Sequence, residues 1–373
     1  MRAIVTGQIG LDKKAYLADV ARFAGEQGEP ISLYNVGDSM YAEAPDVRPG
    51  RILDLPLSRL HSLRRAAFKD VIADSQGQAN ILVNTHATFR WRHGLFSAFD
   101  FDQITKLKPD LFVCLVDNIE MVHHRLHREH EIDATMKDCM VWREEELLAT
   151  ELMSQAVPGS DFCIVSRGRH ASTVRTMFRL ACRPEMRKVY PSFPMSHVVD
   201  MPDVLAEIDH FRAQLAEQFI TFDPGDVDEK LLLERALEAA RDGHEFFDHA
   251  PHSFGGGADA EPLRCRTREV LDIAGDIDGQ IYMRDFKLID QSDMIVSYIP
   301  ELAGGIPGLS SGVERELHHA FEHTKEVYVV WRPSRTPSPF ITETATKIFS
   351  TVDEALRHFE EAGMFAQTNL FGH

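Results

Sequence analysis

The stretch Ala3-Ile-Val-Thr-Gly7-Gln-Ile-Gly10-Leu-Asp-Lys13-Lys14 places a short β-branched run directly before two glycines and two lysines. A helical pattern follows it, from about Lys13 to Gln27. Further apolar runs occur, with helical stretches between them, at residues 31–34, 80–84, 110–116 and 161–165. Short apolar runs separated by helices are typical of strands buried on both faces of a parallel sheet. The first half of the chain is therefore predicted to be an α/β domain.

A second α/β pattern begins with the strand-like run at residues 187–190. The other predicted elements of this half are helices at 202–218, 228–242, 285–291 and from 313, and strands at 219–222, 294–299 and 327–331. Residues 244–265 contain three consecutive glycines and are predicted to be a loop. Ser311 and Glu314 form an S-x-x-E pattern that is typical of a capping box. The chain is thus predicted to hold two domains, residues 1–183 and 187–365.

Composition limits the possible partners. The 373 residues carry 58 acidic and 40 basic side chains, for a formal charge of −18. Such a surface repels phosphate backbones, so no nucleic acid partner is expected. The five cysteines form no C-x-x-C pair, which argues against a zinc site or a disulfide framework. No apolar run approaches the roughly 20 residues of a membrane span, and the start lacks a signal peptide's apolar core. We expect a cytoplasmic protein with no membrane partner.

The first glycine-rich loop resembles the phosphate-binding pattern GxxxxGK[ST], in which backbone N–H groups and a lysine hold phosphates. Gly7 and Lys13 fit this pattern. Asp12 stands where the second glycine belongs, and Lys14 where the magnesium-binding hydroxyl belongs. Magnesium and phosphate positioning supply nearly all the catalysis in this class. The loop therefore favours a scaffold or a nucleotide-holding domain over an active kinase.

Two further motifs follow this loop, Asn35-Val-Gly-Asp-Ser-Met40 and Val83-Asn-Thr-His-Ala-Thr-Phe89. After them come the run at 110–116 and a helix with Arg125 and Arg128. In this order the motifs resemble the archaeal-type adenylate kinase family over roughly residues 1–180. The resemblance implies a P-loop kinase-like parallel sheet, with a nucleotide held by Gly7, Gly10, Lys13, His86 and Thr88, the last two near the monophosphate.

Three motifs of the second half carry another resemblance. They are Tyr190-Pro-Ser-Phe-Pro-Met-Ser-His197, Asp285-Phe-Lys-Leu-Ile-Asp-Gln-Ser-Asp293 and Pro307-Gly-Leu-Ser-Ser-Gly-Val-Glu-Arg-Glu-Leu-His-His-Ala320. Together they resemble the nucleoside 2-deoxyribosyltransferase family, including relatives that hydrolyse nucleoside 5′-monophosphates. The resemblance implies a flavodoxin/Rossmann-like domain in an α/β chain.

The same resemblance implies a nucleophile. In that family a glutamate lies four residues after a loop glycine and four before a small residue, and Gly312, Glu316 and Ala320 meet this spacing. Glu316 would attack the anomeric carbon, expel the base and form a glycosyl-enzyme ester. Asp285 matches the family aspartate that contacts the sugar or the leaving base, although a helix N-cap explains it equally well.

The resemblance also bears on the substrate. Two residues before the loop glycine, the deoxyribosyltransferases have an aspartate and the nucleotide-hydrolysing relatives a serine. Here that residue is Ser310, which favours a substrate with a 5′-phosphate at a helix N-terminus. The other residues expected to bind substrate are Ser311, Gly312, Pro194, Ser196, His197 and Asp293.

The predicted function is cleavage of the N-glycosidic bond of a nucleotide through Glu316. Base exchange by a deoxyribosyltransferase, a nucleotide monophosphate kinase and a nucleotide-sensing protein are the alternatives. We expect no cofactor, and no metal, because His318 and His319 are explained as solvated or core histidines. By resemblance, a homo-oligomer and a second nucleotide in the N-terminal domain are also expected.

Overall fold

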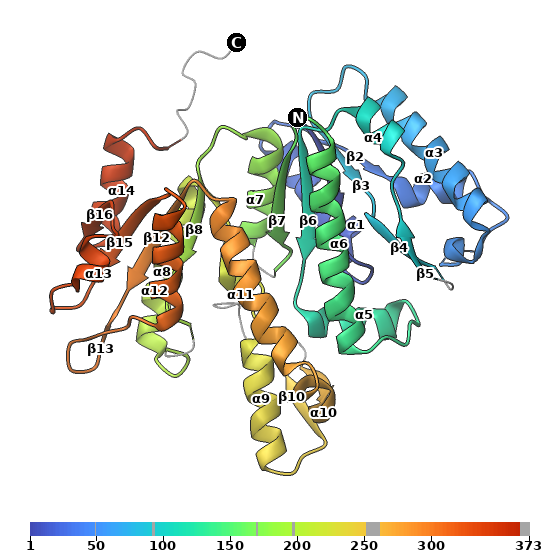
Figure 1. Cartoon of the computed structure of the whole chain (residues 1–373). Helices are drawn as coiled ribbons and strands as arrows, with labels where there is room; N and C mark the ends of the chain where they lie inside the picture. The colour runs from blue at the N-terminus through green and yellow to red at the C-terminus, as the bar shows by residue number, and fades with distance from the viewer. Residues whose placement is uncertain (49, 92–93, 169–170, 196–197, 251–261, 366–373) are drawn as a thin grey trace. The chain divides into compact units, whose positions relative to one another are not determined.

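The computed structural model describes the chain except for residues 49, 92–93, 169–170, 196–197, 251–261 and 366–373 (Figure 1). Its contacts divide the chain into two compact units. Unit 1 holds residues 1–182 and, in the described ranges, 229–250 and 262–277. Unit 2 holds, in the described ranges, residues 183–228 and 278–365. The predicted second domain, 187–365, thus includes a segment that packs with the first unit.

Unit 1 is built on a five-stranded parallel sheet with the strand order β2-β3-β1-β6-β7. Its strands are β1 (Arg2–Thr6), β2 (Ser32–Asn35), β3 (Ile81–Asn84), β6 (Leu111–Val116) and β7 (Asp161–Ser166). Its helices are α1 (Lys13–Glu26), α2 (Val36–Ala42), α3 (Leu57–Asp74), α4 (Phe101–Leu107), α5 (Ile119–Glu129), α6 (Met136–Ala156) and α7 (Ala171–Cys182). A hairpin of β4 (Thr88–Trp91) and β5 (Gly94–Ser97) follows β3. The predicted α/β architecture of this half is confirmed.

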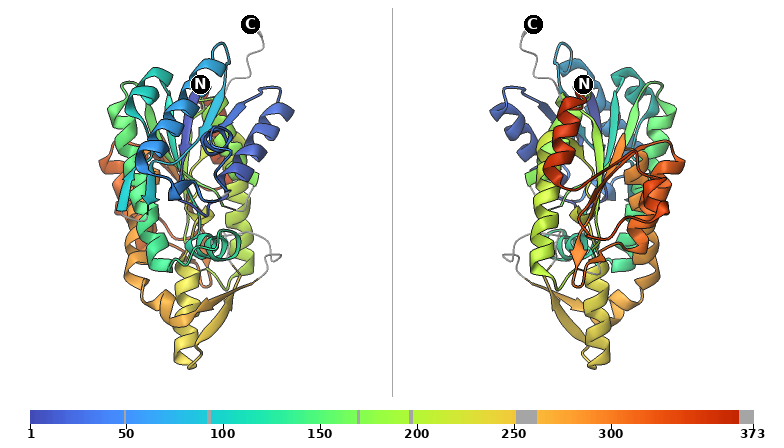
Figure 2. Two further views of the ribbon diagram at one scale, coloured as in Figure 1. Left: turned by 90° about the vertical axis from the view of Figure 1, so that its right-hand side faces the viewer. Right: turned by 90° about the vertical axis from the view of Figure 1, so that its left-hand side faces the viewer.

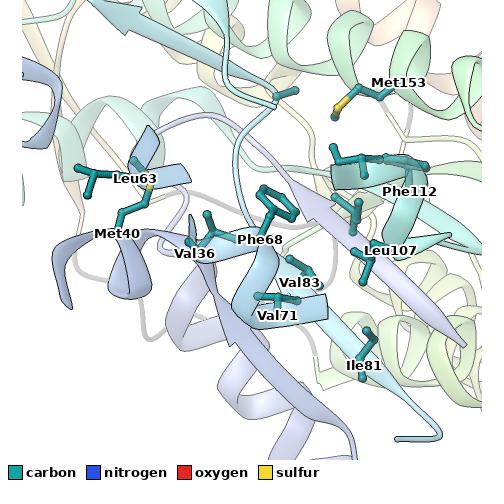
Figure 3. Packing of buried hydrophobic residues seen from close by; sticks show 14 of the residues in the cluster. Val36, Met40, Leu63, Phe68, Val71, Ile81, Val83, Leu107, Phe112 and Met153 are labelled. Carbon is teal, nitrogen blue, oxygen red and sulfur yellow. The ribbon is translucent and has the colours of Figure 1, made fainter. Parts of the chain in front are cut away.

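One face of this sheet carries a large apolar core (Figure 3). Ile4, Val83 and Phe112 point to this face from three neighbouring strands, since alternate residues of a strand share a face. Phe68 of α3 and Met153 of α6 cover them. Burying a side chain of this size contributes about 1.5–3 kcal/mol, so the core fixes α3 and α6 on the sheet.

The segment of unit 1 that comes from the second half contains α9 (Lys230–Arg241), β10 (Phe246–His249), β11 (Leu263–Arg266) and α10 (Thr267–Leu271). The strands β10 and β11 pair antiparallel. Two buried contacts attach the segment: Arg143 Nη1 lies 2.5 Å from Glu229 Oε1, and His249 Nε2 lies 3.6 Å from Glu120 Oε1. The prediction of a loop over 244–265 was therefore wrong for β10 and the start of β11.

Unit 2 has a five-stranded parallel sheet with the order β16-β15-β12-β8-β9. Its strands are β8 (Lys188–Ser192), β9 (Ile220–Thr221), β12 (Met294–Ile299), β15 (Glu326–Trp331) and β16 (Lys347–Phe349), and β13 (Glu301–Leu302) and β14 (Ile306–Pro307) form a short ribbon. Its helices are α8 (Pro202–Gln218), α12 (Ser311–Glu322), α13 (Pro339–Thr342), α14 (Val352–Glu361) and, from residue 278, most of α11 (Ala274–Asp290). In chain order the strands run 2-1-3-4-5, the flavodoxin-like doubly wound order.

The two faces of the unit 2 sheet differ. Helices α8 and α14 cover one face with an apolar core that includes Val189, Val296 and Phe359. Figure 2 (right) shows α14 (red) and α8 (yellow-green) on one side of the sheet, and α12 (orange) on the other. The residues that alternate with this core, such as Tyr190 and Ser297, therefore point to the α12 side.

Two predicted helix starts were wrong. The helix predicted at 285–291 is the end of the 17-residue α11, so Asp285 lies inside a helix and does not cap one. Ser310, and not Ser311, is the N-cap of α12, and its hydroxyl accepts the Val313 N–H at 3.2 Å.

Within the described ranges, no helix combines the length and the apolar composition that a membrane span requires.

Gly7 has no room for a side chain. Its φ is +142°, and an added Cβ would lie 2.5 Å from Leu11 Cδ1 and 2.8 Å from the Leu115 carbonyl oxygen. We therefore expect Gly7→Ala to lower the free energy of unfolding by at least about 2 kcal/mol. Gly25→Ala is the control, since nothing lies within 4 Å of its added Cβ, and it should be neutral or stabilise by up to about 1 kcal/mol. Equal urea midpoints for the two variants would contradict this prediction.

Candidate functional site

The first candidate site lies where β1 and β3 end. In open parallel sheets, ligands bind outside the carboxyl ends of the strands. Residues 7–12 connect β1 to α1, and residues 85–87 connect β3 to β4. Because β1 and β3 are parallel neighbours, the two connections lie at the same edge of the sheet. Both phosphate-binding motifs predicted from the sequence are therefore in one place.

Glu146, from the middle of α6, places its carboxylate between these two loops. Oε1 accepts the Gly7 N–H at 3.2 Å and the Ala87 N–H at 2.7 Å. Oε2 accepts the Thr88 N–H at 2.9 Å and the Thr88 hydroxyl at 2.6 Å. Converging backbone N–H groups form an anion-binding site. Here the anion that they bind is a carboxylate of the chain itself.

Lys13 and His86 complete this cluster. Lys13 is only 6% exposed; its Nζ donates to the Gly7 carbonyl at 2.5 Å and lies 3.2 Å from His86 Nδ1. Burial lowers the pKa of Lys13 to about 8, with the Glu146 carboxylate opposing the shift. Burial also lowers the pKa of His86, and the Lys13 ammonium lowers it further.

Glu146 stays ionised in spite of its burial. Burial by itself raises the pKa of Glu146, but the His86 ring, the Lys13 ammonium and the Thr88 hydroxyl outweigh it and hold that pKa at about 2. The carboxylate is 2% exposed. A buried charge of this kind is tolerated only when donors and an opposite charge surround it.

The two departures from the phosphate-loop pattern have partners of their own. Asp12 adopts a left-handed conformation, with φ 51°, and its carboxylate lies 3.4 Å from Arg167. Lys14 is exposed and pairs with Asp38 at 2.6 Å. Arg125 is buried against Asp117 at 2.8 Å and donates to the Gly10 carbonyl. These three charged groups are thus held by protein partners.

Gln8 is the one buried loop side chain for which the described part of the chain supplies no hydrogen bond. It is 5% exposed, and neither its Nε2 nor its Oε1 has a partner there. Buried amide groups are normally satisfied by protein, water or ligand. Gln8 is therefore available to a molecule bound at the loop.

The second candidate site surrounds Glu316 on the α12 side of the unit 2 sheet. Tyr190 and Ser192 are two residues apart on β8, so they share a face. The Tyr190 hydroxyl donates to Glu316 Oε1 at 3.0 Å, and the Ser192 hydroxyl donates to Oε2 at 2.6 Å. Ser297 of β12 donates to Ser192 at 3.4 Å. Strands β8 and β12 are the first and third of this 2-1-3-4-5 sheet, and ligands bind at that switch point in such folds.

The Glu316 carboxyl group titrates near neutrality. Burial raises the pKa of Glu316 to about 7, while the bonds from Ser192 and Tyr190 oppose the shift. Burial, followed by the charges of Asp285 and Glu316, raises the pKa of Tyr190 well above its usual range. Since Tyr190 stays protonated, it remains a donor to Glu316. A buried carboxyl group tuned toward neutral pH in a strand-end site is typical of catalytic groups.

Asp285 lies close enough to this site for its charge to act on Tyr190. It is 9% exposed and belongs to α11. The adjacent Arg284 donates to the Val227 carbonyl at 2.6 Å. Burial raises the pKa of Asp226 well above its usual range, and the charge of Asp223 raises it further.

The other predicted substrate-binding residues lie in different settings. Asp293 accepts the Lys188 N–H at 2.8 Å and so has a structural partner at the strand start. Pro194 is buried just after β8, and Ser311 and Gly312 are exposed in the first turn of α12. Ser196 and His197 lie outside the described residues.

The sequence did not single out Glu146, Tyr190, Ser192 or Ser297 as site residues. Tyr190 and Ser192 had a usable signal, because two hydroxyl side chains alternate with apolar ones at the end of a predicted strand. Glu146 had none: it is one of three consecutive glutamates on a helix, and only the packing of α6 brings it to the loop.

Comparison with known proteins bears on unit 1. Residues 6–140 match the family model described as an AAA domain. The match covers well under half of the chain, and it supports a P-loop kinase-like N-terminal domain. None of the curated proteins compared with the chain matches it. A structure of phosphoglycerate kinase from Coxiella burnetii is 12% identical to this chain; the alignment covers 96% of this chain and 83% of the phosphoglycerate kinase chain. Its TM-score is 0.18, which is too low to indicate a shared fold. The deoxyribosyltransferase resemblance of the second half stays a prediction.

The pKa of Glu316 predicts a pH-dependent stability. Because that pKa is raised from 4.5 to about 7 in the folded protein, the protonated carboxyl group is favoured by folding. Its contribution is fully present below pH 4.5 and is lost as the pH rises through about 7, for a total on the order of 3 kcal/mol. Glu316→Gln keeps a neutral group at every pH. Its free energy of unfolding should therefore rise relative to the wild type between pH 5 and pH 9.

Urea unfolding at both pH values measures this difference. Glu314→Gln is the matched control, because Glu314 is exposed on the same helix. Parallel pH dependences of the wild type and Glu316→Gln would show that the carboxyl group is not perturbed.

Proposed function

We propose that the P-loop kinase-like domain binds a nucleotide through its phosphates at the loop of residues 7–13. The observation that carries this proposal is the glycine-rich loop at the carboxyl edge of the sheet, with the buried Lys13 ammonium against its Gly7 carbonyl. The N–H groups of Gly7, Ala87 and Thr88 are bonded to Glu146, so a phosphate at these donors would displace that carboxylate. The unpartnered amide of Gln8 offers a further donor and acceptor. The family match over residues 6–140 supports the same class of ligand.

Binding is better supported than phosphoryl transfer. Lys14 replaces the hydroxyl that would bind magnesium, and it pairs with Asp38 instead. The Glu146 carboxylate lies between the phosphate loop and the loop that precedes Thr88. An ionised carboxylate there repels a phosphoryl group that passes between the two loops. The domain is thus proposed to hold a nucleotide, and a nucleotide monophosphate kinase is the alternative.

Calorimetric titration of the full chain with ATP, ADP and AMP tests this proposal. Lys13→Ala should weaken nucleotide binding by at least about tenfold, since it removes a charge-assisted contact. Lys14→Ala is the control and should leave affinity unchanged. Glu146→Gln keeps the side-chain shape and removes the negative charge, so it should tighten nucleotide binding.

Equal affinities of the wild type and Lys13→Ala would contradict the proposed site. ADP formation from ATP and a nucleoside monophosphate, lost in Lys13→Ala, would instead establish the kinase alternative.

We also propose a second activity, in unit 2: cleavage of the N-glycosidic bond of a nucleotide through Glu316. One specific observation favours it, namely a buried carboxylate with a hydroxyl donor on each oxygen at the switch point of a doubly wound sheet. An oxygen of Glu316 would bond to the anomeric carbon as the bond to the base breaks, and the base would leave with that electron pair and take up a proton. Water would then hydrolyse the ester and release the sugar phosphate.

The residues around Glu316 have distinct proposed roles. Tyr190 and Ser192 hold the carboxylate in a fixed orientation, which positions the attacking oxygen. Asp285 is proposed to contact the sugar or the base, and Ser310, the cap of α12, to lie near a 5′-phosphate at the helix N-terminus. Base exchange with an acceptor base is the alternative outcome of the same intermediate.

Chromatography for free base tests this second activity on a panel of nucleoside and deoxynucleoside monophosphates. The wild type should release base, and Glu316→Gln should release it at least about a thousandfold more slowly. The rate should rise with pH to a plateau above about 7, because the nucleophile must be ionised. A requirement for an acceptor base would identify a transferase. Base release that survives in Glu316→Gln would exclude this residue as the nucleophile.

A further inference from the structure

Three metal-ligating side chains meet between α11 and α12, away from the contacts of Glu316. His319 and His323 are four residues apart on α12, so they share a helix face, and Asp290 is the last residue of α11. One ligand atom from each of the three lies within 4.8 Å of the others. His319 Nε2 is 2.7 Å from Asp290 Oδ1. Of the residues that the structure describes, these form a group with the reach to surround one ion.

Both imidazole rings are held in place. His323 Nδ1 donates its proton to the His319 carbonyl at 2.8 Å. A ring nitrogen that donates is protonated, so Nε2 of the neutral ring carries the free lone pair. Metal-bound histidines are typically oriented in this way, with the second nitrogen donating to a carbonyl or carboxylate. The His319 ring stacks on Phe286, with centroids 4.3 Å apart and planes at 24°.

We propose that Asp290, His319 and His323 bind a divalent transition-metal ion, of which zinc is the expected one. Two imidazoles and one carboxylate suit zinc and its neighbours cobalt, nickel and copper. Magnesium and calcium prefer oxygen ligands throughout and would bind poorly. Three protein ligands leave a fourth position for water. An ion bound at His319 Nε2 would replace the present hydrogen bond between that nitrogen and Asp290 Oδ1.

The ion would join α11 to α12. Tyr282 of α11 accepts a bond from Arg315 of α12 at 3.3 Å, one turn before the Phe286–His319 stack. A bound ion would strengthen the connection that Asp290 already makes to His319 of α12 and extend it to His323. The effect is structural and does not depend on either activity proposed above. One charge opposes it: Lys325 Nζ lies 2.7 Å from the Asp290 carbonyl oxygen.

The sequence drew attention to the adjacent histidines His318 and His319, which helical geometry places on different faces. His318 is exposed and lies 3.3 Å from Glu322, so His318→Ala is a matched control: it removes an exposed imidazole next to the site but outside it. His323→Ala removes one proposed ligand from an exposed position, which spares the core.

The experiment uses the full chain, stripped with a chelator and then freed of it. Zinc is titrated by calorimetry, and cobalt by its visible absorption, which is intense only for four-coordinate sites. We expect the wild type and His318→Ala to bind one zinc ion alike, and His323→Ala to bind it at least about tenfold more weakly. Saturating zinc should raise the thermal midpoint of the wild type and of His318→Ala, but not of His323→Ala.

These measurements distinguish zinc binding at Asp290, His319 and His323 from zinc binding by other histidines. Zinc affinity and thermal shift that are the same in the wild type and His323→Ala would overturn the proposal, because other histidines would then account for binding. Absence of zinc binding by the wild type would overturn it as well. Circular dichroism of His323→Ala without metal, equal to that of the wild type, assigns a lost shift to the ligand and not to misfolding.

Discussion

The buried carboxylate of Glu146 is the interaction on which unit 1 most depends. It accepts hydrogen bonds from the loop after β1 and from the residues that lead into β4, so it fixes both strand-end connections to α6. One turn earlier on the same helix, Arg143 donates to the Asp117 carbonyl and pairs with Glu229. Helix α6 therefore connects the phosphate loop to the segment that comes from the second half of the chain. Because an unpaired buried charge costs several kcal/mol, each partner constrains the others.

Two buried glutamates in this chain behave in opposite ways for the same physical reasons. Glu146 has an ammonium and backbone N–H groups around it, and its pKa is held at about 2. Glu316 has two neutral hydroxyl donors but no cation against it in the described residues, and burial raises its pKa to about 7. The first is a permanent anion that organises a loop. The second changes charge near neutral pH, which suits chemistry more than structure.

Local pattern was a good guide to the strands. The apolar runs at 110–116 and 294–299 correspond to β6 and β12, because a strand buried on both faces has a distinctive composition. The sequence pattern was a poor guide to helix starts, which capping hydrogen bonds determine, and to the segment around β10, whose structure depends on tertiary packing. From sequence, a helix is predicted over about 142–155, but α6 begins six residues earlier, at Met136, because Thr135 and Asp138 form a capping box. The segment around β10 has weak periodicity, and its contacts with unit 1 are long-range.

By itself, the sequence determined the α/β class, the glycine-rich loop before Lys13 and the helical spacing of Gly312, Glu316 and Ala320, since these depend on residues close together in the chain. Only the tertiary structure decided what those residues contact. It put Glu146 on the loop's N–H groups, Ser192 and Tyr190 on Glu316, and Asp290 beside His319. These pairs are separated by tens to more than one hundred residues, and sheet order and helix packing, not local spacing, bring such residues together.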